Sequence, residues 1–150
     1  MRSALLDTNL IVLLIVGLAG KQFITTHKRT KDFIEEDYDL LVQTINNFDR
    51  LWITSHCLSE VSNLLKQTHE DFAKKLMLVF AQFADHMKES HISKSKIFEN
   101  ELVFRLGVAD TGFVEKSRKV TCSFTTDLDL YLELCRLGRK VINFNHLRML

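Results

Sequence analysis

Short apolar runs alternate along the chain with stretches in which apolar residues recur every three or four positions. Short runs predict buried strands, and helical spacing predicts helices that cover a core. The predicted strands are 3–6, 51–54, 91–95, 119–126 and 140–144. The predicted helices are 8–19, 35–48, 55–65, 69–88, 97–106, 109–117 and 127–137. This alternation predicts an α/β fold with a mainly parallel central sheet of about five strands, covered by helices on both faces.

Polar residues and glycines mark the boundaries of these elements. Thr8 or Asn9 can cap the first helix, and Gly20 follows its last turn, a position that glycine commonly takes. Gly107 separates two short helices, and residues 21–31 form a basic loop or an irregular helix. The chain shows no repeat, linker or low-complexity tract. Its 150 residues are therefore interpreted as a single domain.

The most apolar run, 10–18, raises the question of a membrane or targeting segment. It is shorter than the roughly 20 residues that span a bilayer. The small residues at 17–19 resemble a signal cleavage site, which makes a secretory signal an alternative. Against that alternative, Asp7 directly precedes the run and Arg2 is the only positive side chain before it. We expect no membrane segment and a cytoplasmic protein.

Composition excludes several classes of protein. With 46% hydrophobic residues, 26% charged residues and no proline, the chain is typical of a globular domain and not of a disordered one. Cys57, Cys122 and Cys135 lie far apart and form no CxxC pair, so we expect buried reduced thiols and neither disulfides nor a zinc site. The six histidines show no HxxxH or HxH spacing, which argues against a histidine-based metal site.

Acidic residues follow the predicted strands. The acids in these positions are Asp7 after strand 3–6, Glu60 on the helix after 51–54, Asp110 at the start of a helix, and Asp127 and Asp129 after 119–126. Because ligands bind outside the carboxyl ends of parallel strands, we expect these carboxylates to converge at one edge of the sheet. Taken singly, each of them is equally consistent with a helix cap or a solvated side chain.

Converging carboxylates repel one another, which raises some of their pKa values, and a divalent cation relieves that repulsion. Oxygen ligands without nearby histidine or cysteine suit Mg²⁺ or Mn²⁺ and not zinc. Such an ion can activate water and stabilise charge on a phosphodiester during in-line displacement. The acids therefore favour metal-dependent chemistry on a phosphodiester.

Three stretches that contain these acids resemble the PIN-domain nuclease family, in particular its small VapC-like toxins. They are LLDTNL at 5–10, SEVSNLL at 59–65 and TTDLDLYLELCRLGRKVINFN at 125–145, and the likeness covers most of the chain. It implies a PIN-like three-layer α/β/α fold, with residues 1–150 forming one nuclease domain. Asp110 holds the third acidic position in the family's order, although Thr111 and Gly112 follow it in place of the usual small or aliphatic run. Glu101 and Glu115 are alternatives for this position, but they are less well placed.

The resemblance implies a metal-dependent endoribonuclease that cuts RNA with an activated water and leaves a 5′-phosphate. Its catalytic acids are expected to be Asp7, Glu60, Asp110 and Asp127. Mg²⁺ or Mn²⁺ would be held by Asp7, Asp110, Asp127 and Asp129, the last as a ligand or as a supporting acid. Glu60 would complete the site or orient the water.

Other side chains near the acids suit the same chemistry. Threonines and asparagines are placed to hydrogen-bond the carboxylates or a metal-bound water, namely Thr8, Asn9, Thr125 and Thr126. The chain has 20 basic and 19 acidic residues, so it is modestly basic once the acids of the site are set aside, which suits a phosphate backbone. The densest basic stretch offers Lys28, Arg29 and Lys31 as RNA contacts.

Small members of the PIN family commonly act as toxins that an antitoxin neutralises, and they often dimerise. The resemblance therefore implies the toxin of a type II toxin–antitoxin pair, with a cognate antitoxin and a homodimer. The apolar faces of 35–48 or 72–83 are candidates for either interface, although burial in the core explains most of them. Two alternatives remain. One is a catalytically inactive PIN-like module that binds RNA or protein. The other is a phosphatase-like enzyme with an aspartate nucleophile, whose DxD signature is replaced here by Asp7-Thr8-Asn9.

Overall fold

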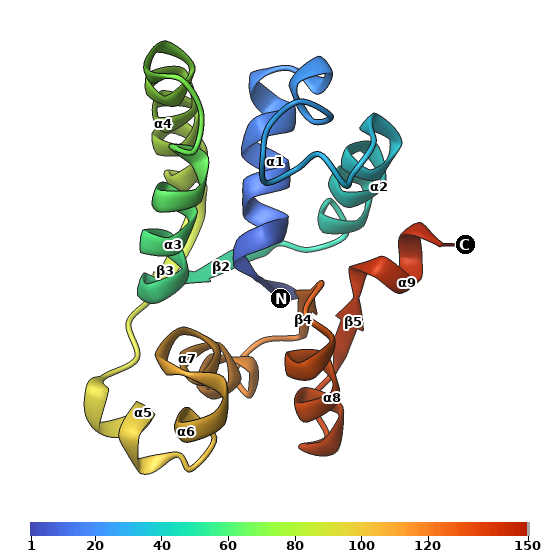
Figure 1. Ribbon diagram of the computed structural model, residues 1–150. Helices are drawn as coiled ribbons and strands as arrows, with labels where there is room; N and C mark the ends of the chain where they lie inside the picture. The colour runs from blue at the N-terminus through green and yellow to red at the C-terminus, as the bar shows by residue number, and fades with distance from the viewer. Residues whose placement is uncertain (150) are drawn as a thin grey trace.

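The computed structural model describes residues 1–149 and has an α/β fold built on a five-stranded, all-parallel sheet (Figure 1). The strands are β1 Ser3–Leu6, β2 Arg50–Thr54, β3 Met87–Ser90, β4 Cys122–Thr125 and β5 Val141–Asn143. Their order in the sheet is β3-β2-β1-β4-β5. The chain thus moves outward from β1 through β2 and β3, then returns to the other side of β1 for β4 and β5. The predicted fold class is confirmed.

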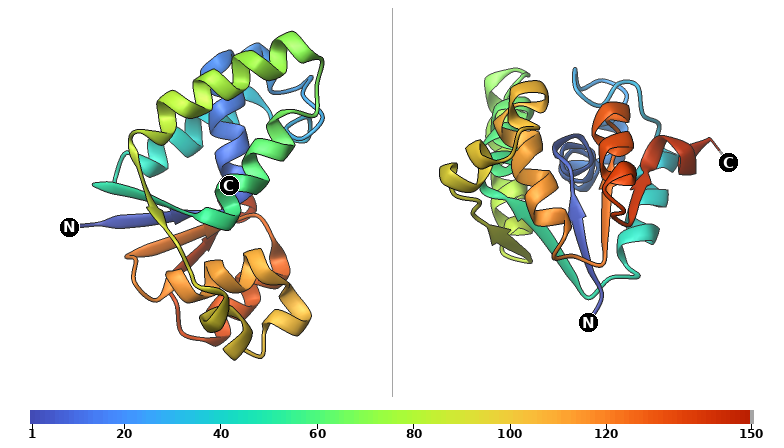
Figure 2. Two further views of the ribbon diagram at one scale, coloured as in Figure 1. Left: turned by 90° about the vertical axis from the view of Figure 1, so that its left-hand side faces the viewer. Right: turned by 90° about the horizontal axis from the view of Figure 1, so that it is seen from below.

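Helices form a layer on each side of the sheet (Figure 2). One layer contains α1 Thr8–Ala19, the 3-10 turn Lys21–Phe23, α2 Glu35–Ile45, α3 Ser55–Leu65 and α4 Glu70–Ala84. The other contains α5 Lys94–Glu99, α6 Val103–Leu106, α7 Val108–Ser117 and α8 Leu128–Arg136. The last described helix is α9 Phe144–Arg148. α7 contacts both α3 and α8, which brings together elements that are far apart in the sequence.

The apolar run that follows Asp7 forms the most buried helix of the fold. Each residue from 10 to 16 is at most 1% exposed, because α1 packs against β4 and against α2, α3 and α4. Gly17 allows the Tyr38 ring of α2 to lie directly on the α1 backbone, where a Cβ would overlap the ring. Within residues 1–149, no helix is long and apolar enough to cross a membrane.

The predicted strand at 91–95 is wrong. The third strand is Met87–Ser90, paired in parallel with β2, and α5 begins at Lys94 with Ser93 as its N-cap. Helical spacing over 69–88 hid the boundary, because buried Met87 fits both the helix period and the strand.

The predicted helix 97–106 is also wrong, since it is two short helices. Asn100 interrupts it in an extended conformation, and its side-chain oxygen accepts the N–H of Leu102. α9 was not predicted at all. It is too short for periodicity to reveal, and Asn143 caps it by accepting the N–H of Asn145.

The three cysteines within residues 1–149 are free, but only two of them are buried. Cys57 and Cys122 lie in the core, as expected. Cys135 is exposed, so the prediction of a buried thiol is wrong there. The reason is the face of α8 on which it lies, since the neighbouring Leu134 takes the fully buried position.

Candidate active site

The acids lie at the carboxyl ends of the strands, next to the two paired strands β1 and β4 in the middle of the sheet. The chain leaves the carboxyl end of β1 toward one half of the sheet and that of β4 toward the other half. Such a point, where strand order reverses, is where open α/β sheets bind ligands. Asp7 follows β1, and its backbone N–H donates to the carbonyl oxygen of Phe124 on β4 (3.1 Å). The two strand ends are therefore fixed against each other at this position.

Asp7 is held by hydrogen bonds from both sides and is only 7% exposed. Its Oδ1 accepts the Thr8 N–H (2.8 Å), so Asp7 itself is the N-cap of α1, in place of the expected Thr8 or Asn9. Its Oδ2 accepts the Thr125 hydroxyl (2.6 Å), and that hydroxyl accepts the backbone N–H of Asp127 (3.0 Å). Thr125 thus joins the two acids that follow β1 and β4.

Glu60 reaches the same edge from α3. Its Oε1 accepts the hydroxyl hydrogen of Thr8 (2.9 Å), which fixes the exposed glutamate at the start of α1. Thr8 therefore supports a carboxylate as expected. Asn9 and Thr126 contact each other instead, with 3.5 Å between Asn9 Nδ2 and Thr126 Oγ1. Of the threonines at the end of β4, the one that binds a carboxylate is Thr125.

Asp110 lies in the first turn of α7, partly buried, and senses the other acids of the site. Its pKa is raised to about 7, first by burial and then by the charges of four carboxylates, namely Asp7, Asp127, Glu60 and Asp129. Because charge–charge effects weaken with distance, this pattern indicates that the acids surround one region. The structure brings Asp110 into the cluster, as its place in the sequence suggests.

The pKa of Asp7 is also raised above its ordinary value, and burial is the largest cause. The hydrogen bonds from Thr125 and Thr8 oppose the rise, while the charges of Glu60 and Asp127 add to it. A buried carboxylate next to other carboxylates is unfavourable unless a positive charge compensates it. A cation bound among these carboxylates would therefore stabilise their ionised forms.

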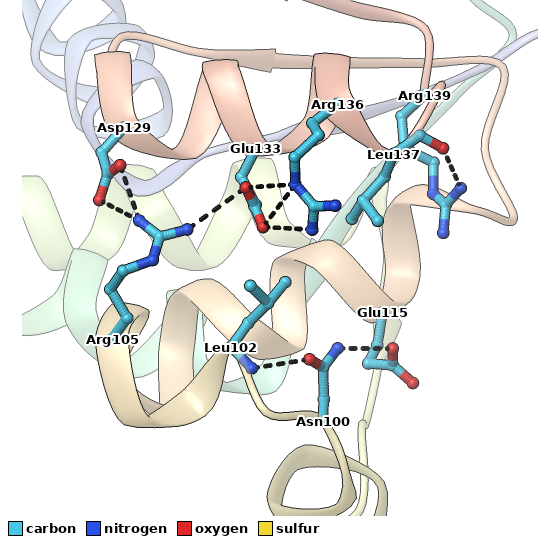
Figure 3. Close-up of polar contacts among 9 residues, drawn as sticks. All are labelled: Asn100, Leu102, Arg105, Glu115, Asp129, Glu133, Arg136, Leu137 and Arg139. Atoms are coloured by element: carbon cyan, nitrogen blue, oxygen red, sulfur yellow. Dashed lines mark hydrogen bonds and ion pairs between the residues drawn. The ribbon is translucent and has the colours of Figure 1, made fainter.

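Asp129 is arranged differently from the other acids. It is exposed on α8, and the Nη1 of Arg105 donates to both of its carboxylate oxygens (2.8 and 2.9 Å; Figure 3). The same guanidinium contacts Glu133 Oε2 through Nη2 (3.3 Å), and Arg136 binds Glu133 from the other side. The structure thus gives Asp129 an arginine partner from α6, and metal ligation would require that pair to open. Sequence reasoning missed Arg105, whose approach to α8 has no signature in the sequence.

Asp127 caps α8, since its Oδ1 accepts the N–H of Leu130 (3.1 Å). Within residues 1–149, no three His, Cys, Asp or Glu side chains are already arranged to hold a metal ion. Several of the carboxylate oxygens are turned toward hydrogen-bond donors of the protein. The donor set itself fits a hard cation, because it consists of carboxylate oxygens. The Cys57 thiol is a soft ligand, but burial, followed by the charge of Asp7, raises its pKa to about 12 and keeps it protonated.

Gly112, on the turn after Asp110, faces His56 of α3. A Cβ at Gly112 would lie 3.5 Å from His56 Nδ1, which is an ordinary contact. That imidazole nitrogen is buried without a hydrogen-bond partner among the described residues. Neither residue was expected to matter from the sequence. The glycine in the helix that carries Asp110 is therefore compatible with the fold and is not required by crowding.

The basic residues proposed as RNA contacts separate into two groups. Lys28 and Arg29 line a cavity beside Asn9 and Thr126, whereas exposed Lys31 does not line it.

The chain matches no protein-family model and no curated protein. The function must therefore be argued from the geometry of the carboxylates and of the surface around them.

Proposed function

We propose that the protein is a metal-dependent endoribonuclease of the PIN type. The observation that carries the proposal is the convergence of Asp7, Glu60, Asp110 and Asp127 where the strand order reverses. Burial first, and then the charges of the other acids, raise the pKa of Asp110, and a bound cation would offset both effects. The PIN-like order of acids along the chain supports the same reaction class.

In this proposal Asp7, Asp110 and Asp127 would hold Mg²⁺ or Mn²⁺, and Asp129 could take part only if its pair with Arg105 opened. When bound, the ion supplies positive charge at the scissile phosphate and an activated water. Thr125 keeps Asp7 and Asp127 in a fixed relation through its hydroxyl. In the metal-free protein burial and the neighbouring carboxylates raise the pKa of Asp110 to about 7, so a cation that binds there would displace a proton near neutral pH.

Thr8 has the corresponding role for Glu60. Its hydroxyl orients Glu60 from the first residue of α1, so the glutamate is positioned by the same turn that carries Asp7. In this proposal Glu60 would complete the site or orient the water, and its hydrogen bond from Thr8 supports that role. A residue that fixes the angle of a catalytic acid contributes to rate without touching substrate.

The test is cleavage of a labelled single-stranded RNA in Mn²⁺ or Mg²⁺ and in EDTA. Asp7→Asn and Asp127→Asn serve as the active-site variants. Asp85→Asn is the matched control, because Asp85 is exposed at the end of α4, away from the acids. We expect cleavage that needs metal, is lost in the two active-site variants and persists in the control. Cleavage in EDTA, or full activity in Asp7→Asn, would overturn the mechanism.

A toxin role follows from the resemblance and is proposed with it. The partners are then a cognate antitoxin and a second copy of the chain, and the compartment is the cytoplasm. On α4, the exposed Leu78 is an apolar position that either interface could cover, whereas Leu76 and Phe80 are already in the core. Expression of the wild type should arrest growth, and expression of Asp7→Asn should not. Growth arrest by both proteins would contradict a toxin that acts through cleavage.

A catalytically inactive PIN-like module is the second candidate. Two observations favour it. Residues 1–149 contain no group of three side chains already arranged to bind a metal, and Arg105 donates hydrogen bonds to both carboxylate oxygens of Asp129. The same assay separates the two candidates. An inactive module binds the RNA and leaves it intact at every Mn²⁺ or Mg²⁺ concentration.

A further inference from the structure

A polar cavity of about 300 Å³ lies next to the carboxylate cluster and is not part of it. Its walls come from the start of α1, the loop between the 3-10 turn and α2, the end of β4, and α9. The lining residues that matter here are Asn9, Lys28, Arg29, Thr126, Asn145 and Arg148. None of the catalytic acids lines it.

Asn9 and Thr126 both line the cavity and are close in the sequence to two of the acids. Asn9 is two residues after Asp7, and Thr126 directly precedes Asp127. Their side chains approach each other at 3.5 Å and both line the cavity. The cavity therefore borders the two chain segments that carry Asp7 and Asp127.

The far wall of the cavity is held in place by Arg148 of α9. Its guanidinium pairs with buried Asp37 of α2 (2.7 Å) and lies over the Phe33 ring, 4.6 Å from the centroid. It also donates to Asn145 Oδ1 (3.3 Å), and Asn145 Nδ2 donates to the carbonyl oxygen of Thr126 (3.3 Å). Because Asp37 neutralises Arg148, this arginine shapes the cavity and contributes little net charge.

The positive charge of the cavity comes from Lys28 and Arg29. Both side chains are exposed, and none of the ion pairs found within residues 1–149 includes either of them. Arg29 Nε donates to Gln67 Oε1 (2.6 Å), a neutral partner that orients the guanidinium and leaves its charge uncompensated. Asp32 is the single acid in the lining, so the two cations outnumber it.

We propose that this cavity binds one nucleotide of the RNA strand beside the scissile bond, with its phosphate on Lys28 and Arg29. Asn9 and Asn145 line the same space, and the hydrogen-bonding capacity that their amides keep beyond the contacts with Thr126 and Arg148 can serve the sugar or the base edge. A volume near the lower end of the range for ligand sites, about 300 to 1,000 Å³, suits a single nucleotide of an unpaired strand. The identity of the ligand rests on the proposed nuclease function.

The test measures binding separately from cleavage. A fluorescein-labelled single-stranded RNA of mixed sequence is titrated with protein in EDTA, with anisotropy as the readout, at several salt concentrations. The variants are Lys28→Ala, Arg29→Ala and the double variant. Lys31→Ala is the matched control, since it removes the same charge from the same loop outside the cavity. Circular dichroism verifies that all of them fold.

We expect the double variant to bind on the order of tenfold more weakly at low salt, and each single variant to lower the salt slope by about 0.7. Lys31→Ala should change neither quantity appreciably. In Mn²⁺ the double variant should raise KM and leave kcat nearly unchanged. Equal weakening by Lys31→Ala would overturn the proposal, because it would mean diffuse attraction without a site.

The two proposals fail separately in this design. If the wild type cleaves RNA and the double variant binds as tightly as the wild type, the nucleotide site is wrong and the nuclease stands. If the wild type cleaves nothing but the double variant loses binding, the site stands and the nuclease is wrong. If the RNA does not bind at all, the site is refuted.

Discussion

Replacing Asp110 with asparagine is expected to stabilise the metal-free protein near pH 8. In the folded state, burial and neighbouring carboxylates raise the pKa of Asp110 from 3.8 to about 7. Between those two values the unfolded chain has already lost the proton that the folded chain keeps. The free energy of unfolding therefore falls as the pH rises through this window, and it stays at the lower value above it. Asparagine removes the ionisation and with it the loss.

The size of the effect follows from the two pKa values. A difference of about three, at 1.36 kcal/mol for each, sets an upper limit of about 4 kcal/mol. Asp110 is only partly buried, so water and salt screen much of this. We expect a gain of about 1–2 kcal/mol for Asp110→Asn at pH 8, or about 2–4 °C in Tm for each kcal/mol. The gain at pH 8 should be about two to three times that at pH 5.

The assay is urea unfolding followed by circular dichroism, in EDTA, at pH 5 and pH 8. Asp85→Asn provides the control, since it makes the same change at an exposed position. It should leave the free energy of unfolding within about 0.5 kcal/mol at both pH values. If Asp110→Asn is no more stable than the wild type at pH 8, or if its gain is the same at both pH values, the folded protein does not raise the pKa of Asp110 and the reasoning is refuted.

Three further changes test other parts of the site and fold. Thr125→Val should lower stability by about 1–3 kcal/mol and abolish most cleavage, because Asp7 loses a buried hydrogen bond, whereas Thr125→Ser should retain both properties. In thermal melts, Gly17→Ala should destabilise the protein by about 1–3 kcal/mol, because the new Cβ would overlap Tyr38. Gly112→Ala should instead stabilise it by up to about 1 kcal/mol, because alanine has the higher helix propensity. Destabilisation by both variants would contradict the packing described. Millimolar Mn²⁺ should raise the Tm of the wild type and not that of Asp7→Asn, and an equal rise in both would remove Asp7 from the metal site.

Periodicity and strand-end acids predicted much of this architecture. The runs at 3–6, 51–54 and 140–144 are strands within one or two residues, because a parallel sheet buries both of its faces and its strands become short apolar runs. The boundary between α4 and β3 was misplaced, since a buried residue satisfies either period. The break between α5 and α6 and the start of α9 depend on asparagine side chains that accept backbone N–H groups, a local signal that hydrophobic spacing does not carry.

The candidate site shows the same division. The sequence named the acids, and the fold assembles Asp7, Glu60, Asp110 and Asp127 around one region. It could not distinguish Asp129, which looks like its neighbour Asp127 in the sequence but is bound by Arg105 from a different helix. Neither could it separate Lys28 and Arg29 from Lys31, since only the surrounding walls make a cavity.

The sequence by itself determined which residues are apolar and at what period, and therefore the order of strands and helices and the acids that follow the strands. Only the tertiary structure decided which of those acids lie close enough to affect one another's pKa, which acid pairs with an arginine, and which basic residues line a cavity. Secondary structure depends on neighbours a few positions apart, so a single chain displays it directly. The electrostatic and hydrogen-bond partners of the acids lie 24 residues apart for Arg105 and Asp129 and 118 apart for Thr125 and Asp7, so they depend on the packing of the whole sheet and its helices.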